Sequence, residues 1–199
     1  ILESGYAQVD GLFALAPWLY LFLVPAVTMR MFAEEKHSGT IELLYTKPLS
    51  ELQIVLGKYL AGVVLVMLSL IPTIIYYFSD YYLAEPLGNI DSGAFWGSFI
   101  GLFFLAVVYV SVGIFASSLT ENQIVAFLLA LVMCFVLFIG FDLVGSIFSS
   151  GKVQAAFSFF GINDHYESMS RGVIDLRDVV YFISAAAIFI IATTRTIKR

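Results

Sequence analysis

Several stretches of about 20 apolar residues set the strongest limit on how this chain can fold. Each is long enough to cross roughly 30 Å of hydrocarbon at about 1.5 Å per residue. Strands of a membrane barrel would instead show short segments of alternating polarity. With 60% hydrophobic and 13% charged residues among 199, the chain also lies outside the composition of soluble domains. The sequence therefore predicts an all-α, polytopic transmembrane helical bundle.

We expect one transmembrane domain over residues 1–199, with five spans. They are predicted at about 12–31, 52–78, 94–117, 122–146 and 176–194. Pro17 and Pro25 should kink the first span, which neighbouring helices tolerate in a bundle. The small residues Gly97 and Gly101 favour close helix packing, within the chain rather than between copies.

Two sequence patterns mark the starts of spans. Ser50 with Gln53, and Thr120 with Gln123, have the spacing of capping boxes. Only "SLTEN" separates the third span from the fourth. These two spans are therefore expected to form an antiparallel hairpin.

The distribution of Lys and Arg predicts which connections face the cytoplasm. Seven of the ten lie in 30–58 and in the tail after the last span, and three lie in 147–178. Cytoplasmic connections carry the excess of basic residues, so 30–58 and the C-terminus should be cytoplasmic. Segment 147–178, too polar to span and rich in aromatic residues, should face outward as an interfacial or re-entrant element.

Catalysis within the chain has little support from the sequence. His37 and His165 lie on opposite sides in this topology, so they cannot share a metal, and no phosphate-binding loop or zinc-protease motif occurs. Cys134 is expected to be a small buried residue. Asp142 is the one clear intramembrane acid, near the outer end of the fourth span, with either a structural role or a place on a translocation path or outer gate.

The cytoplasmic coupling segment, about 32–51, carries acids that topology alone does not require. Gly39 is suited to end a helix that leaves the membrane, and Thr40 to cap a short helix after it. One face of this helix should form an exposed apolar ridge made of Ile41, Leu44 and Tyr45. A solvated loop that merely follows the positive-inside rule is the alternative interpretation.

Within this segment, "EEKHSGTIELLYTKPLS" resembles the coupling segment of type-2 ABC exporter permeases. The matching positions are Glu34, Glu35, Gly39, Thr40, Glu42, Leu43, Leu44 and Pro48. A second stretch, "NDHYESMSRGVIDLRDVVYFISAAA", resembles the outer loop and last span of the subgroup containing the gliding-motility-associated permease subunit GldF. The resemblance covers nearly the whole chain.

The resemblance implies a non-catalytic permease subunit of an ATP-driven exporter in the bacterial cytoplasmic (inner) membrane. Such a subunit forms a dimer with a second copy or a sister permease and docks a cytoplasmic ATPase that binds ATP and Mg, so no cofactor is expected in this chain. The family has six spans, so a further span is expected before Ile1. The bilayer, and an accessory outer-facing subunit, complete the expected partners; nucleic acid is not among them. A gradient-driven transporter or channel is the alternative, and a membrane-embedded enzyme is the third hypothesis.

Overall fold

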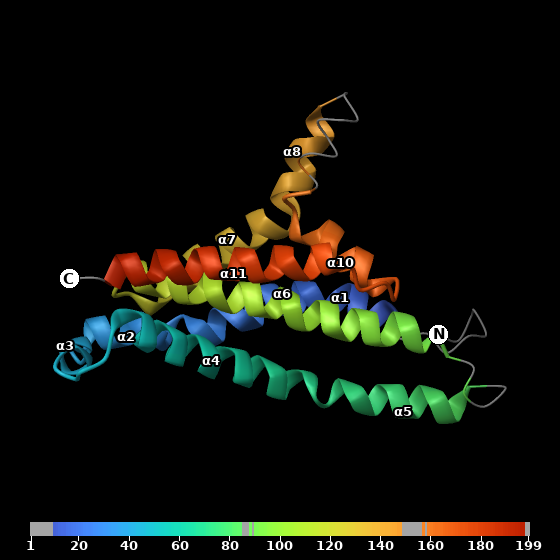
Figure 1. Ribbon diagram of the computed structural model, residues 1–199, viewed down its shortest axis with the longest axis horizontal. Helices are drawn as coiled ribbons and strands as arrows, with labels where there is room; N and C mark the ends of the chain where they lie inside the picture. Colours follow the sequence, from blue (N-terminus) through green and yellow to red (C-terminus); the bar gives the residue numbers. More distant parts are fainter. Residues whose placement is uncertain (1–9, 85–87, 89, 149–156, 158, 198–199) are drawn as a thin grey trace.

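The computed structural model describes residues 10–84, 88, 90–148, 157 and 159–197, and every regular element in this part of the chain is helical. In chain order the elements are α1 (Asp10–Thr28), α2 (Arg30–His37), α3 (Ile41–Tyr45), α4 (Glu51–Leu70), α5 (Thr73–Leu83), α6 (Ser92–Leu119), α7 (Gln123–Phe135), the π-helical turn η1 (Val136–Gly140), α8 (Phe141–Ile147), α10 (Ile162–Ser170) and α11 (Leu176–Ile197). Figure 1 shows an elongated bundle in which α6 runs through the middle. The predicted all-α bundle is confirmed.

Five stretches of helix are long and apolar enough to cross a membrane. They are Gly11–His37, Glu51–Leu83, Ser92–Leu119, Gln123–Ile147 and Leu176–Ile197. Each overlaps one of the predicted spans, and α11 begins at the residue expected for the last one. The first, second, third and fifth extend beyond the predicted ends because helix continues past the apolar core of each segment.

The first two spans are interrupted. Pro17 and Pro25 both lie inside α1, but the break that separates α1 from α2 comes later, at Met29. In the second span Pro72 separates α4 from α5, because proline has no N–H to continue the helical ladder. The start of α4 is as predicted, since the Ser50 side chain accepts from the Gln53 N–H and the Gln53 side chain accepts from the Ser50 N–H.

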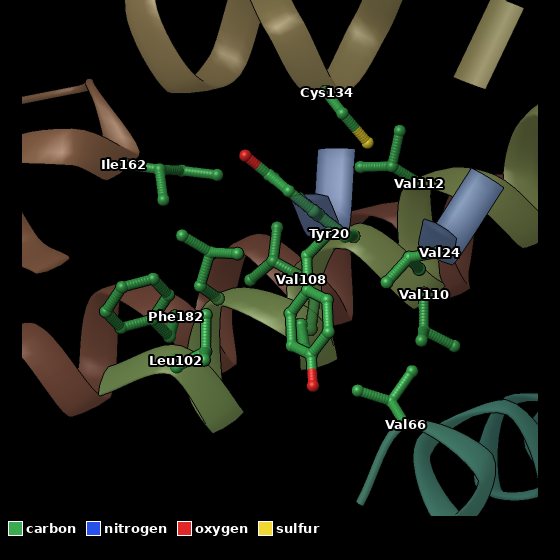
Figure 2. Packing of buried hydrophobic residues seen from close by; sticks show 14 of the residues in the cluster. Tyr20, Val24, Val66, Leu102, Val108, Val110, Val112, Cys134, Ile162 and Phe182 are labelled. Carbon is green, nitrogen blue, oxygen red and sulfur yellow. The ribbon is translucent and has the colours of Figure 1, made fainter. Parts of the chain in front are cut away.

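α6 is the centre of the bundle, in contact with α1, α2, α4, α7, α10 and α11. The most apolar window of α6 is 67% buried, against 22% for the windows of the fourth and fifth spans, so those two present most of their apolar surface to their surroundings. Figure 2 shows side chains from several helices meeting around α6: Tyr20, Val24, Val66, Leu102, Val108, Val110, Val112, Cys134, Ile162 and Phe182. Cys134 is buried as predicted.

Glycines let other helices approach α6 closely. A Cβ atom at Gly97 would lie 2.2 Å from the Met169 carbonyl oxygen on α10, and one at Gly113 would lie 2.0 Å from Thr28 Oγ1 on α1. Gly101 likewise faces Tyr166 and Met169 of α10. The expectation that the Gly97 and Gly101 pair serves packing within the chain is confirmed.

The fourth span bends away from the bundle. Asn122 caps α7 by accepting N–H bonds from Ile124 and Val125, while Thr120 accepts from the Asn122 N–H instead of forming the predicted capping box. The short turn does produce the expected antiparallel packing of α6 and α7. Beyond η1, α8 turns away from the axis of α7 (Figure 1). Part of the segment that follows, 149–156 and 158, lies outside the described residues.

The described end of segment 147–178 is integrated into the bundle. α10 packs on α6, and its buried face has helical spacing: Ile162, His165, Tyr166 and Met169. The Tyr166 hydroxyl donates to the Phe13 carbonyl of α1 at 2.7 Å. Burial raises the pKa of this hydroxyl above its usual range, so it stays protonated and remains a donor. Within the described part of this segment, α10 is therefore packed tightly on the bundle.

Candidate functional site

The predicted coupling segment forms a compact helical unit, α2 and α3, at the end of the bundle that also holds the C-terminus (Figure 1). Gly39 adopts a φ of 70° directly after α2, a left-handed conformation that glycine reaches without strain. The Ser38 and Gly39 N–H groups bond back to the carbonyls of Glu34 and Lys36. The predicted helix end at Gly39 is confirmed.

Thr40 precedes α3 but does not cap it as predicted. Its backbone is helical and its side chain makes no capping bond; Thr40 Oγ1 instead lies 2.9 Å from Ser38 Oγ. A helical backbone at this position points the hydroxyl away from the N–H groups of the next turn.

The apolar ridge of α3 faces the bundle, not solvent. Ile41 and Leu44 pack against the core, and the Tyr45 hydroxyl donates to the Ile197 carbonyl of α11 at 2.9 Å. The prediction of an exposed ridge was wrong, because these side chains are partly buried against α11 and the core. The exposed side of α3 carries Glu42 and Leu43 instead, with Leu43 65% exposed.

Ser117 of α6 holds the break between α1 and α2. Its hydroxyl accepts the N–H groups of Phe32 and Ala33, both at 3.0 Å, and donates to the Met29 carbonyl at 2.8 Å. In an uninterrupted helix those N–H groups would bond to the carbonyls of Thr28 and Met29. A side chain inserted into the ladder in this way is a recognised cause of a kink.

Lys58 of α4 holds α2 from another side. Its ammonium donates to Glu35 Oε1 at 2.6 Å and to the Met31 carbonyl, and it lies 4.8 Å from the centre of the Phe32 ring. The two charged side chains are 18% and 29% exposed, so their attraction is only partly screened by solvent. Lys36 adds a bond to the Ser118 carbonyl of α6.

These contacts divide the predicted site residues into two groups. Glu35 and Leu44 face the bundle, whereas the exposed group is Glu34, Gly39, Thr40, Glu42, Leu43 and Pro48. A cavity of about 500 Å³ lies near the end of α2, lined by His37 and by the turn before α7. The site therefore has one side exposed to its surroundings and an opposite side that is hydrogen-bonded to α4, α6 and α11.

A family model described as ABC-2 family transporter protein matches residues 11–195 of the chain. No curated protein matches it significantly. The match covers far more than half of the sequence. The chain belongs to the ABC-2 transporter family.

ABC-2 proteins are membrane permease subunits of ABC transporters, which agrees with the five candidate spans of this chain. It is a multi-pass membrane protein. Among its described residues no group of three or more His, Cys, Asp or Glu side chains is arranged to hold a metal ion.

Asp142 of this ABC-2 protein is the first-turn acid of α8, directly after η1. Its Oδ1 atom is buried and has no hydrogen-bond partner among the described residues. A cavity of about 630 Å³ lies between α1, α6, η1 and α10, and its lining includes Trp18, Phe138 and Glu167. α8, the helix that carries Asp142, lies apart from α2 and α3 (Figure 1).

His165 is buried, not solvated. Its Nδ1 lies 2.7 Å from Asp178 Oδ1 on α11, its Nε2 lies 2.9 Å from the Phe159 carbonyl oxygen, and its ring stacks on Tyr181 with centroids 3.9 Å apart. This pair joins α10 to α11. His165 therefore has a structural role, and its burial is acceptable because both ring nitrogens are bonded.

Sequence reasoning missed three of these contacts: Ser117 at the helix break, Lys58 with Glu35, and His165 with Asp178. Only the second had a usable signal, because a lysine inside an apolar span needs a polar partner or an exit to water. Nothing local distinguishes Ser117 from the neighbouring Ser118.

Proposed function

We propose that this chain is the transmembrane permease subunit of an ATP-driven exporter, and that α2 with α3 couples it to a separate cytoplasmic ATPase. Movement of the ATPase would displace this unit, and the spans would follow as rigid bodies because packed interfaces switch between discrete arrangements. ATP and Mg would be bound by the ATPase.

The observation that carries the proposal is that α2 and α3 are bonded to three different spans at once. Lys58 joins α2 to α4, Ser117 joins it to α6, and Tyr45 joins α3 to α11. A loop that only satisfied topology would need none of these bonds. A force applied to this unit would therefore reach several spans without passing through a flexible connection.

The exposed surface of the unit supports docking of a partner. Glu34 and Glu42 are exposed acids, and Leu43 is an exposed apolar side chain of α3. An apolar contact with charges around it is typical of protein interfaces. In this proposal the partner is the ATPase, and the unit and the C-terminus are cytoplasmic.

The remaining partners are proposed from the sequence resemblance alone. The permease would act as a dimer, with a second copy or a sister subunit, in the bacterial inner membrane, and an accessory outer-facing subunit fits the same arrangement. A link to gliding motility rests only on the resemblance of residues 163–187. The substrate is not identified by these residues.

The docking proposal is tested with the full-length permease and its ATPase. Glu42→Arg should weaken complex formation about tenfold or more, because an exposed interface acid becomes a base facing the same partner. Glu167→Arg, a reversal at an exposed acid on α10, is the matched control and should leave the complex intact. Equal binding of wild type and Glu42→Arg would show that this surface does not dock the ATPase.

The coupling proposal needs a variant that keeps the docking surface. Glu35→Lys should lower transport per ATP hydrolysed, because two ammonium groups then face each other between α2 and α4. The exchange Glu35→Lys with Lys58→Glu should restore it in part. If the single variant transports normally at wild-type ATP turnover, the bond between α2 and α4 does not carry coupling.

A gradient-driven transporter or channel is the alternative, and the buried unpartnered oxygen of Asp142 favours it. Bilayers that contain the permease without any ATPase decide between the two. Ion conductance that Asp142→Asn abolishes would support the alternative; a silent bilayer together with ATP-dependent transport supports the exporter.

A further inference from the structure

A second cleft, of about 820 Å³, lies between the fourth and fifth spans. One wall is formed by Leu137 of η1 and Phe141 of α8. The other is the face of α11 that carries Val180, Ile188 and Phe189. The cleft faces away from α6 and is open to the surroundings of the bundle.

The interior of the cleft offers hydrocarbon and few free polar groups. The Tyr181 hydroxyl donates a hydrogen bond to the Phe160 carbonyl at 2.6 Å, and the Ser184 hydroxyl donates one to the Tyr181 carbonyl at 2.8 Å. Because these hydroxyl donors are already used, a ligand gains little by presenting polar groups to this wall. An apolar chain fits it best.

The mouth of the cleft carries one basic side chain, Arg177, next to the acid Asp175. The Arg177 guanidinium lies 4.3 Å from the centre of the Phe159 ring, and no ion pair joins it to a carboxylate within the described ranges. The neighbouring Asp175 uses its Oδ1 to accept the Arg177 N–H at 3.0 Å. Arginine at the end of an apolar surface is well suited to bind a phosphate in two-point geometry.

The wall beside Arg177 is fixed by the buried histidine. His165 packs edge-on against Phe159, bonds the Phe159 carbonyl, and stacks on Tyr181. Asp178 holds the imidazole from α11. The aromatic side chains that frame the mouth are therefore positioned by a bonded network, not by surface packing alone.

We infer that this cleft binds a phospholipid with a net negative headgroup, its phosphate at Arg177 and an acyl chain along α11. From Arg177 to Phe189 the helix rises about 18 Å at 1.5 Å per residue, close to the roughly 15 Å depth of one leaflet's hydrocarbon. The lipid would come from the leaflet farther from α2 and α3.

The test is fluorescence quenching by lipids with brominated acyl chains. Ile188→Trp and Ile191→Trp are compared in a chain whose own Trp18 and Trp96 are changed to Phe. Ile188 lines the cleft, whereas Ile191 lies on the same helix, is 57% exposed and does not. Both variants are reconstituted in phosphatidylcholine vesicles that contain a small fraction of a brominated lipid. This lipid is either brominated phosphatidylglycerol or brominated phosphatidylcholine.

Quenching of Ile188→Trp should favour brominated phosphatidylglycerol over brominated phosphatidylcholine by about fivefold, the preference expected from one basic side chain near an anionic headgroup. Ile191→Trp should show a ratio near one. Adding Arg177→Gln should remove the preference at 188, and adding Arg171→Gln, the other described arginine at this end, should keep it.

Equal quenching by both lipids at 188 would overturn the inference. So would weak quenching at 188 with crosslinking of Ile188→Cys to a second copy, because a protein would then fill the cleft. Native mass spectrometry of the otherwise unaltered chain with phosphatidylglycerol provides a second measurement. Retention of the lipid by Arg177→Gln as strongly as by Arg171→Gln would also contradict it.

Discussion

Ser117 shows how one side chain sets the geometry of a span. Its hydroxyl accepts hydrogen bonds from two backbone N–H groups and donates one to a carbonyl, and all three groups lie where α1 passes into α2. Three groups that would otherwise be unpaired in a buried place are satisfied by one atom. The position of the break is therefore fixed by α6, although the prolines lie in α1.

Ser117→Ala should destabilise the fold by about 1 to 3 kcal/mol, because buried backbone groups lose their partner. Ser118→Ala is the control: its hydroxyl bonds only the Phe115 carbonyl of its own helix, so its loss should cost less than about 1 kcal/mol. Unfolding in mixed micelles measures both. Equal effects of the two variants would mean that the bonds of Ser117 across the helices contribute nothing.

Adjacent acids can have opposite roles. Glu34 is exposed, whereas Glu35 is paired with Lys58 and has a second oxygen that is buried without a partner among the described residues. Reversal of Glu35 therefore tests the interior of the permease, and reversal of Glu34 or Glu42 tests its docking surface.

At the scale of elements, glycine spacing decides how closely helices approach. α10 rests on α6 where Gly97 and Gly101 leave room for Met169 and Tyr166. α4 meets α6 in the same way at Gly62, whose added Cβ would lie 2.7 Å from a Val110 methyl group. The described helices thus use small residues inside the chain, in keeping with membrane proteins generally.

Gly97→Ala should destabilise the bundle by about 1 to 3 kcal/mol, because the new methyl group would meet a backbone carbonyl that cannot rotate away. Gly57→Ala on α4 has nothing within 4 Å of the added atom, so it should stabilise by up to about 1 kcal/mol through helix propensity. Hydrogen exchange of 162–170 should rise in the Gly97 variant. Unchanged exchange there would show that α10 tolerates the shift.

The fourth span is not a straight, regular α-helix in the region where function is proposed. η1 has π-helical bonding, and α8 turns away from the bundle after it; the phospholipid cleft and Asp142 both lie at this bend. π-helical turns often occur at functional sites because they re-aim the side chains that follow.

At the scale of the whole molecule, the bundle separates its two proposed sites. The proposed coupling unit lies at the end that also holds the C-terminus, whereas α8 and α10 lie apart from it (Figure 1). α6 contacts α2 near one end and α10 near the other. It is the element best placed to relate movements at the two ends.

Cysteine accessibility tests the proposed orientation. In a Cys134→Ala chain, Leu43→Cys should react with a membrane-impermeant maleimide only in inverted vesicles, and Glu167→Cys only in spheroplasts. Both positions are exposed, and removing the buried native cysteine, Cys134, leaves the introduced thiol as the one that can react. The opposite pattern would place the coupling unit outside the cell and exclude docking of a cytoplasmic ATPase.

The sequence by itself determined the fold class, the existence of five apolar helices, the capping box at Ser50, the helix end at Gly39 and the start of the last span at Leu176. These depend on local hydrophobicity and backbone preference, which are properties of neighbouring residues. The coupling segment was located in the sequence by charge and motif resemblance.

Only the tertiary structure decided which way that segment faces. The ridge of α3 that was predicted to be exposed turned out to be partly buried against the core. Glu35, Ser117 and His165 have long-range partners 13 to 88 residues away in the chain. The outcome depends on which helices meet. No local pattern encodes that, because the free energy of each contact is shared between residues distant in sequence.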